Sequence, residues 1–170
     1  MNLAKKSDVA IKKKTGDQNK ALREHLLYVL RGGGAHVDFN TFIADFPVEL
    51  INEKPAQLPY TPWQVLEHMR LAQSDILEFT RNRDHVSPSF PEGYWPSSEQ
   101  KADRKTWAKT IKLFRADLKA MTNLVEDSAT DLFAEIPHGH GQTIMREALL
   151  IADHNAYHLG ALFVMKRMLE

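Results

Sequence analysis

Cysteine is absent from the 170 residues, which excludes disulfide bonds and a thiol nucleophile supplied by the protein itself. An excess of charge of either sign is also absent, because 22 Lys and Arg residues balance 22 Asp and Glu residues. Domains that bind nucleic acid usually carry a basic stripe, so this balance disfavours a nucleic-acid partner. Any chemistry in this chain must therefore depend on other side chains.

Long apolar runs are missing as well. The most apolar segment, near the C-terminus, is interrupted by Asp153, His154 and His158, which is not expected of a membrane span. No apolar segment typical of a secretory signal follows the lysines near the N-terminus. We therefore predict a cytoplasmic protein without a membrane partner, in which residues 1–16 form a flexible polar leader and residues 17–170 form one domain.

Alternation of polar and apolar residues, which would indicate β-strands, is not found over any useful length. Apolar residues recur instead at helical spacing in four long segments. We expect these helices from about Asp17 to Arg31, from Thr61 to Asn82, from Ser97 or Ser98 onward, and from Thr143 to the end. A shorter helix is expected from Asp38 to Asp45. The pattern predicts an all-α fold, a four-helix bundle with a short extra helix in the first connector.

The connector between the second and third long helices is rich in proline and aromatic residues. It runs from His85 to Ser98 and includes Tyr94 and Trp95. A loop of this length and composition is rarely a plain spacer. We expect it either to cover the core or to form the wall of a pocket.

Three histidines are predicted to face the interior of the bundle. His154 and His158 are four residues apart, so their rings lie on one helix face, beside the apolar stripe that includes Ile151. His68 follows Val65 by three residues and falls on the buried face of its helix. Bundles build metal sites from side chains on facing helices. Three protein ligands would leave an open coordination position, as in catalytic sites.

Zinc is the first expectation for such a site, and nickel, iron and manganese are also compatible with imidazole ligands. Glu67 or Asp153 could orient a ligating histidine through its other ring nitrogen. The alternative is that the three histidines are structural and bond to backbone carbonyls or to neighbouring side chains. A zinc protease is excluded because Asn155, and not a glutamate, follows His154.

The remaining five histidines are weaker candidates. His138 and His140 flank a glycine in a connector, where a solvated loop is the simpler interpretation. His25 could line the pocket around the three inward histidines or lie at the surface. His36 and His85 adjoin loops and are expected to be exposed.

Two segments resemble the DinB-like (DinB/YfiT) superfamily of four-helix bundles. They are residues 61–68, Thr-Pro-Trp-Gln-Val-Leu-Glu-His, and residues 153–160, Asp-His-Asn-Ala-Tyr-His-Leu-Gly. The resemblance implies a divalent metal held by His68, His154 and His158. Because the superfamily includes thiol-dependent transferases, the resemblance also implies that thiol transfer is one reaction to expect.

The residues and the resemblance together predict a metal-dependent enzyme, either a thiol S-transferase or a hydrolase. Its substrate would be a small molecule, and the open metal position would bind water or a low-molecular-weight thiol. The alternative is a non-catalytic metal- or ligand-binding bundle that acts as a stress-response or interaction module. A homodimer is compatible with either function, because small bundles often bury one more helix face.

Overall fold

The computed structural model of the protein describes the backbone of residues 3–56 and 58–170, and the side chains of residues 18–56 and 58–170. Its helices are α1 (Leu3–Arg31), α2 (Phe39–Ala44), α3 (Pro62–Arg81), α4 (Arg104–Glu126) and α5 (Ile144–Leu169), with short 3₁₀ turns η1 (Val48–Leu50) and η2 (Glu92–Tyr94). The described residues contain no strand, only an isolated bridge between Glu135 and Thr143. The predicted all-α fold, with a short helix in the first connector, is confirmed.

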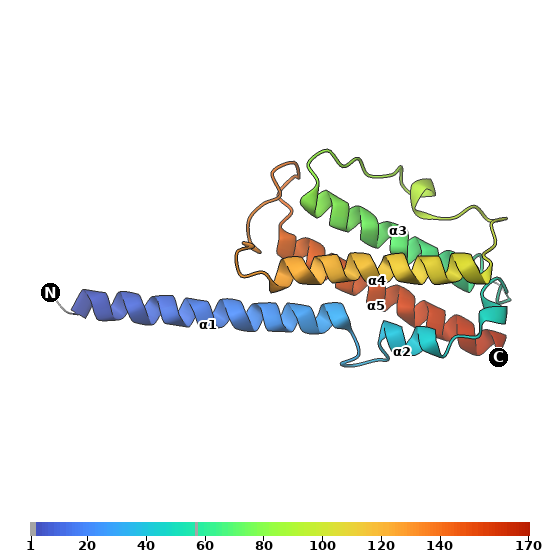
Figure 1. Ribbon diagram of the computed structural model, residues 1–170, viewed down its shortest axis with the longest axis horizontal. Coiled ribbons are helices and arrows are strands. Elements are labelled where there is room, and N and C mark those ends of the chain that lie inside the picture. The colour runs from blue at the N-terminus through green and yellow to red at the C-terminus, as the bar shows by residue number, and fades with distance from the viewer. Residues whose placement is uncertain (1–2, 57) are drawn as a thin grey trace.

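The four long helices form a ring in which α3 and α1 each pack against both α4 and α5. Figure 1 shows α1 and α5 running in one direction along the bundle and α3 and α4 in the other. Neighbouring elements that run in parallel need a long connection. Residues 82–103 supply it and return along the outside of the bundle from the end of α3 to the start of α4 (Figure 1).

Local capping explains where α2, α3 and α5 begin. Thr61 and Gln64 form a reciprocal capping box at the start of α3, with Pro62 in the first turn. The side chains of Asp38 and Thr143 accept backbone N–H groups at the starts of α2 and α5. The predicted starts of these three helices are therefore confirmed.

The predicted start of α4 at Ser97 or Ser98 was wrong. The helix begins at Arg104, where the Asp103 side chain accepts the backbone N–H of Thr106. The carbonyls of Ser97 and Ser98 instead accept hydrogen bonds from the side-chain amide of Gln64. This long-range contact holds the two serines in the loop, although serine is a good helix cap in isolation.

Helix α1 begins at Leu3, well before the expected start at Asp17. Its backbone therefore continues through most of the predicted leader, and Figure 1 shows this end of α1 projecting beyond the other helices. The flexibility of residues 1–16 and the domain boundary at residue 17 stay predictions. At its other end α1 stops at Gly32 and Gly33, whose φ angles of +69° and +85° favour glycine.

The core consists of two clusters of buried apolar side chains, one toward each end of the bundle. The first contains α2 residues such as Phe42, together with residues from α3, α4 and the second half of α5. The second joins Leu26 and Leu30 of α1 to α3, α4 and the first half of α5. No helix within the described residues has the length and apolarity that a membrane span requires. The cytoplasmic location stays a prediction.

Candidate metal centre

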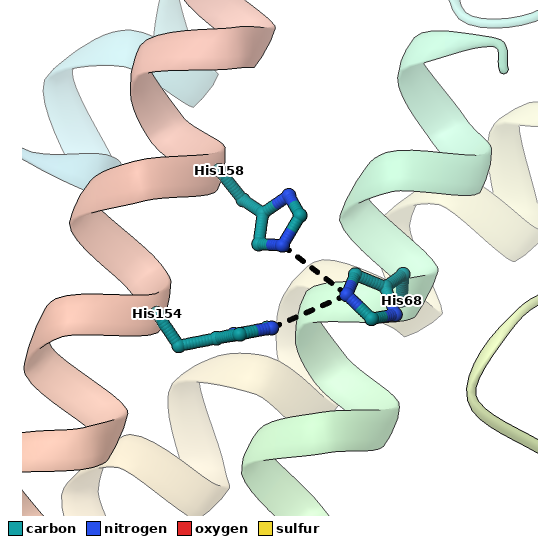
Figure 2. Close-up of side chains that lie close together, drawn as sticks. All are labelled: His68, His154 and His158. Atoms are coloured by element: carbon teal, nitrogen blue, oxygen red, sulfur yellow. Dashed lines mark hydrogen bonds between the residues drawn. The ribbon is translucent and has the colours of Figure 1, made fainter. Parts of the chain in front are cut away.

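Three histidines from two helices meet inside the bundle. His68 lies in the first half of α3, while His154 and His158 lie one turn apart on α5, and all three rings point toward one another (Figure 2). One ring nitrogen from each lies within 4.8 Å of the other two. The Nε2 atom of His68 is 3.2 Å from Nε2 of both His154 and His158.

The backbone of the loop that connects α3 to α4, residues 82–103 and called here the crossover loop, determines the tautomer of His68. Its Nδ1 atom is 2.8 Å from the carbonyl oxygen of Tyr94, and a carbonyl can only accept a hydrogen bond. Nδ1 of the neutral ring therefore carries the proton and donates it. Nε2, which faces the other two histidines, is left with a free lone pair.

That single lone pair cannot serve both neighbours. A neutral imidazole nitrogen accepts one well-aligned hydrogen bond, yet two Nε2 atoms lie 3.2 Å from Nε2 of His68. A metal ion between the rings would use all three lone pairs at once. Nitrogens bound to one tetrahedral zinc ion lie about 3.3 Å apart, so the observed distances fit such an ion.

Burial keeps these rings neutral, the form in which histidine binds metals. Burial lowers the pKa of His68 below its ordinary value. Burial, followed by the neighbouring rings, lowers the pKa of His154 and that of His158 to about 4. The charge of Asp153 opposes this shift at His154 but does not cancel it.

Aromatic rings from the loops fix the plane of His68. Trp95 stacks on His68 with ring centroids 3.9 Å apart and an interplanar angle of 3°. Tyr60 stacks on the other face of Trp95, with centroids 4.0 Å apart. On α5, the ring of Tyr157 stands perpendicular to that of His158. The expected pocket wall at Tyr94 and Trp95 therefore lies directly against the histidine cluster.

A carboxylate on α3 fastens the crossover loop at this point. Asp75 accepts a hydrogen bond from the hydroxyl of Tyr94 at 2.7 Å and one from Nε2 of His85 at 2.7 Å. Burial and then the neighbouring Asp75 raise the pKa of Tyr94 to about 12. Tyr94 therefore stays protonated near neutral pH and keeps donating to Asp75.

The predicted orienting roles of Glu67 and Asp153 were wrong. The carboxylate of Glu67 accepts hydrogen bonds from Thr110 and Arg70, so it turns away from His68. Nδ1 of His154 is buried and has no hydrogen-bond partner among the described residues, which excludes Asp153 as its acceptor. The backbone carbonyl of Tyr94, and neither carboxylate, orients the ring of His68 through its Nδ1 atom.

The other histidines do not join the cluster. His25, His36 and His140 are exposed, and Nε2 of His138 donates to the carbonyl of Phe79. His85 was expected to be exposed but is half-buried by its contact with Asp75. Within the described chain, the three inward histidines form the one group of metal-ligand side chains this close together.

Sequence reasoning did not identify Asp75 or the carbonyl of Tyr94 as parts of the site. Their contacts join α3 to Tyr94 in the loop, 19 and 26 residues further along the chain. No local spacing rule encodes such a contact, and a backbone carbonyl leaves no trace in the residue type. The one available signal was the aromatic character of the loop.

The family of the chain is shown by comparison with known proteins. The family model of the DinB superfamily matches residues 34–162, which include α2, α3, α4 and all three histidines of the cluster. No curated protein and no solved structure matches the chain. Because the family match spans well over half of the sequence, the chain belongs to the DinB superfamily.

Proposed function

We propose that His68, His154 and His158 bind a divalent metal ion and that the protein uses this ion in thiol transfer. The observation that carries the proposal is the approach of two Nε2 atoms to the single lone pair on Nε2 of His68. Zinc fits the nitrogen donors and their spacing, and nickel, iron or manganese would fit the same donors.

The chain supplies the geometry and the partly buried surroundings of this site. Bound there, a divalent ion would lower the pKa of a water or thiol at its open coordination position toward neutrality. The carbonyl of Tyr94 keeps the proton of His68 on Nδ1 and its lone pair directed inward. Trp95 covers one face of His68 and excludes water from it.

Thiol transfer is favoured over hydrolysis by the contacts of Glu67. Attack by water usually requires a base to accept its proton, and Glu67 is the acidic residue adjacent to a cluster histidine on α3. Its two oxygens are already used by Arg70 and Thr110. A thiol loses its proton more readily than water does, so transfer depends less on such a base.

The same contacts favour a second candidate, a bundle that binds a metal or ligand without catalysis. With Glu67 turned away and bonded to Arg70 and Thr110, its carboxylate does not act as an acid or base on an ion held by the cluster. In this second function the ion stabilises the fold or a bound ligand and nothing is converted.

The test begins with elemental analysis of protein purified without a histidine tag or added metal, alongside a His154→Ala variant. We expect about one divalent ion per chain in the wild type and loss of the ion in the variant. Chelation should then lower the melting temperature of the wild type only, because an ion that binds the native state stabilises it. No ion before or after incubation with zinc or nickel would contradict the metal site.

Activity is tested separately. The metal-loaded protein is incubated with cysteine and the electrophile 1-chloro-2,4-dinitrobenzene, and thioether formation is followed by absorbance. Turnover above background that disappears in His154→Ala would support thiol transfer. A bound ion with no turnover for a series of thiols and electrophiles would instead favour the non-catalytic bundle.

A further inference from the structure

A cavity of about 440 Å³ adjoins the histidine cluster on its outer side. His158 belongs to both, because its ring meets His68 on one side and lines the cavity on the other. The cavity lies between the segment before α3, the crossover loop at Trp95 and α5. A group bound there would lie against the ring of His158, at the edge of the cluster.

The walls of this cavity are almost entirely apolar. Among the residues that the structure describes, none with a charged side chain lines it. Polar side-chain atoms in the lining residues are confined to four rings, and the rest of the lining is hydrocarbon or thioether. The rings are Tyr60, Trp95, Tyr157 and His158, and the apolar residues are Leu58, Pro59, Val65, Ala161, Val164 and Met165.

The cavity is formed by parts that are already held in place. Trp95 is fixed between the rings of Tyr60 and His68. Val65 and Met165 are 4% and 3% exposed and belong to the core. Because these walls are packed before any ligand arrives, little ordering would be needed for binding. Small-molecule sites usually have volumes of about 300–1,000 Å³ and mostly apolar walls, as this one does.

We propose that this cavity binds an uncharged apolar group of the substrate, an aromatic ring or a hydrocarbon chain, beside the histidine cluster. An ionised group would lose its hydration without gaining a charged partner in these walls, which is costly. The inference rests on the proposed function only in naming the occupant a substrate. Binding of the apolar group itself requires the cavity and not the metal.

The test uses the full-length, metal-free protein labelled with ¹⁵N-tryptophan, and two probes of similar size. Neutral 2-phenylethanol should shift the indole signal of Trp95 in a saturable way, while the buried Trp63 and Trp107 respond less. Phenylacetate, which carries a negative charge, should bind at least about tenfold more weakly. The Trp95 signal is assigned with a Trp95→Phe variant.

Variants on α5 locate the binding. Ala161→Phe adds a ring inside the cavity and should abolish the shift. Gly160→Phe adds the same ring one residue earlier, at an exposed position outside the cavity lining where an added Cβ meets no neighbour within 4 Å, and should keep it. If Ala161→Phe does not fold, Val164→Glu replaces it. Val164 is 55% exposed, so a carboxylate is tolerated there while still reaching the cavity rim.

Three outcomes would overturn the inference, and a fourth would separate it from the proposed function. Equal binding of both probes, or no saturable shift at Trp95, would mean that the walls do not select an apolar group. A dimer in sedimentation experiments whose dissociation is required for the shift would mean that a second copy occupies the cavity. Selective binding of 2-phenylethanol by a protein that never binds metal would support the cavity and contradict the proposed function.

Discussion

The position of one proton determines what His68 can do. Nδ1 donates to the carbonyl of Tyr94, so the nitrogen that faces His154 and His158 is an acceptor. Two further nitrogens compete for it, and lowered pKa values keep the rings of His154 and His158 neutral. At this scale the protein brings together three ring nitrogens whose hydrogen bonds to one another cannot all be made.

Replacement of His68 tests this arrangement directly. In His68→Ala we expect metal content to fall from about one ion per chain to nearly none, because two ligands on one helix hold an ion less tightly than three. The carbonyl of Tyr94 also loses its partner, which should lower the free energy of unfolding by about 1–3 kcal/mol. His36→Ala, at an exposed histidine outside the cluster, is the matched control and should keep both properties. Stoichiometric metal in His68→Ala would refute a three-ligand site.

Among the elements, the crossover loop does the most for the site. It connects two parallel helices (Figure 1). On its way back it places Tyr94 and Trp95 against His68. Asp75 holds the loop there through the hydroxyl of Tyr94. A connection required by the topology therefore also shapes the metal centre.

Removing that hydroxyl should loosen the loop without unfolding the bundle. In Tyr94→Phe we expect faster hydrogen exchange in residues 82–103. The carbonyl of Tyr94 stays behind His68 but is held less firmly, so metal affinity should fall by up to about 10-fold, the lower end of what loss of such a group costs. Tyr60→Phe also removes one hydroxyl from a ring near Trp95 and is the control. Unchanged exchange and affinity in Tyr94→Phe would show that the contact with Asp75 does not hold the loop.

The short helix α2 depends on its cap. Hydrogen bonds from the side chain and backbone of Thr41 hold the pKa of Asp38 below its usual range. A lowered pKa stabilises the folded state above the unfolded value of about 3.9, and this contribution is lost as pH falls through the folded pKa. Asp38→Ala should cost about 1 kcal/mol at neutral pH in urea unfolding, with a smaller difference from wild type below about pH 4. Asp38→Asn should keep most of the cap, and an equal loss in both variants would contradict this role.

For the whole molecule, α1 completes the ring of helices although the family match begins after it. Its contribution lies in the second half of the helix. Leu26 and Leu30 are buried in a core cluster, and Arg23 donates to the carbonyls of Val125 and Asp127 at the end of α4. These contacts hold the C-terminal part of α1 against the bundle.

We therefore expect the chain without residues 1–16 to fold. Thermal unfolding should give a free energy within about 1 kcal/mol of the full chain, because the buried contacts of α1 described above lie beyond residue 17. Arg23→Met in the same shortened chain serves as a positive control. It should destabilise the chain by about 1–3 kcal/mol, since the carbonyls at the end of α4 lose their donors. A loss of several kcal/mol on truncation would place residues 1–16 within the folded domain.

The sequence by itself determined which segments are helical, the faces that they bury, and the starts of α2, α3 and α5. Thr61 and Thr143 mark the starts of α3 and α5, because caps and periodicity are local properties. The same periodicity places His68, His154 and His158 on inward faces, where the structure brings them together. Helices with apolar stripes have few ways to pack, so the bundle followed from these patterns.

Only the tertiary structure decided what surrounds the cluster. Gln64 holds Ser97 and Ser98 in the loop and moves the start of α4 to Arg104, against the local capping preference. The carbonyl of Tyr94, and not Glu67, orients His68. Each of these contacts joins residues far apart in the chain. Contacts of that kind depend on how the helices and loops pack together, and no short stretch of sequence specifies them.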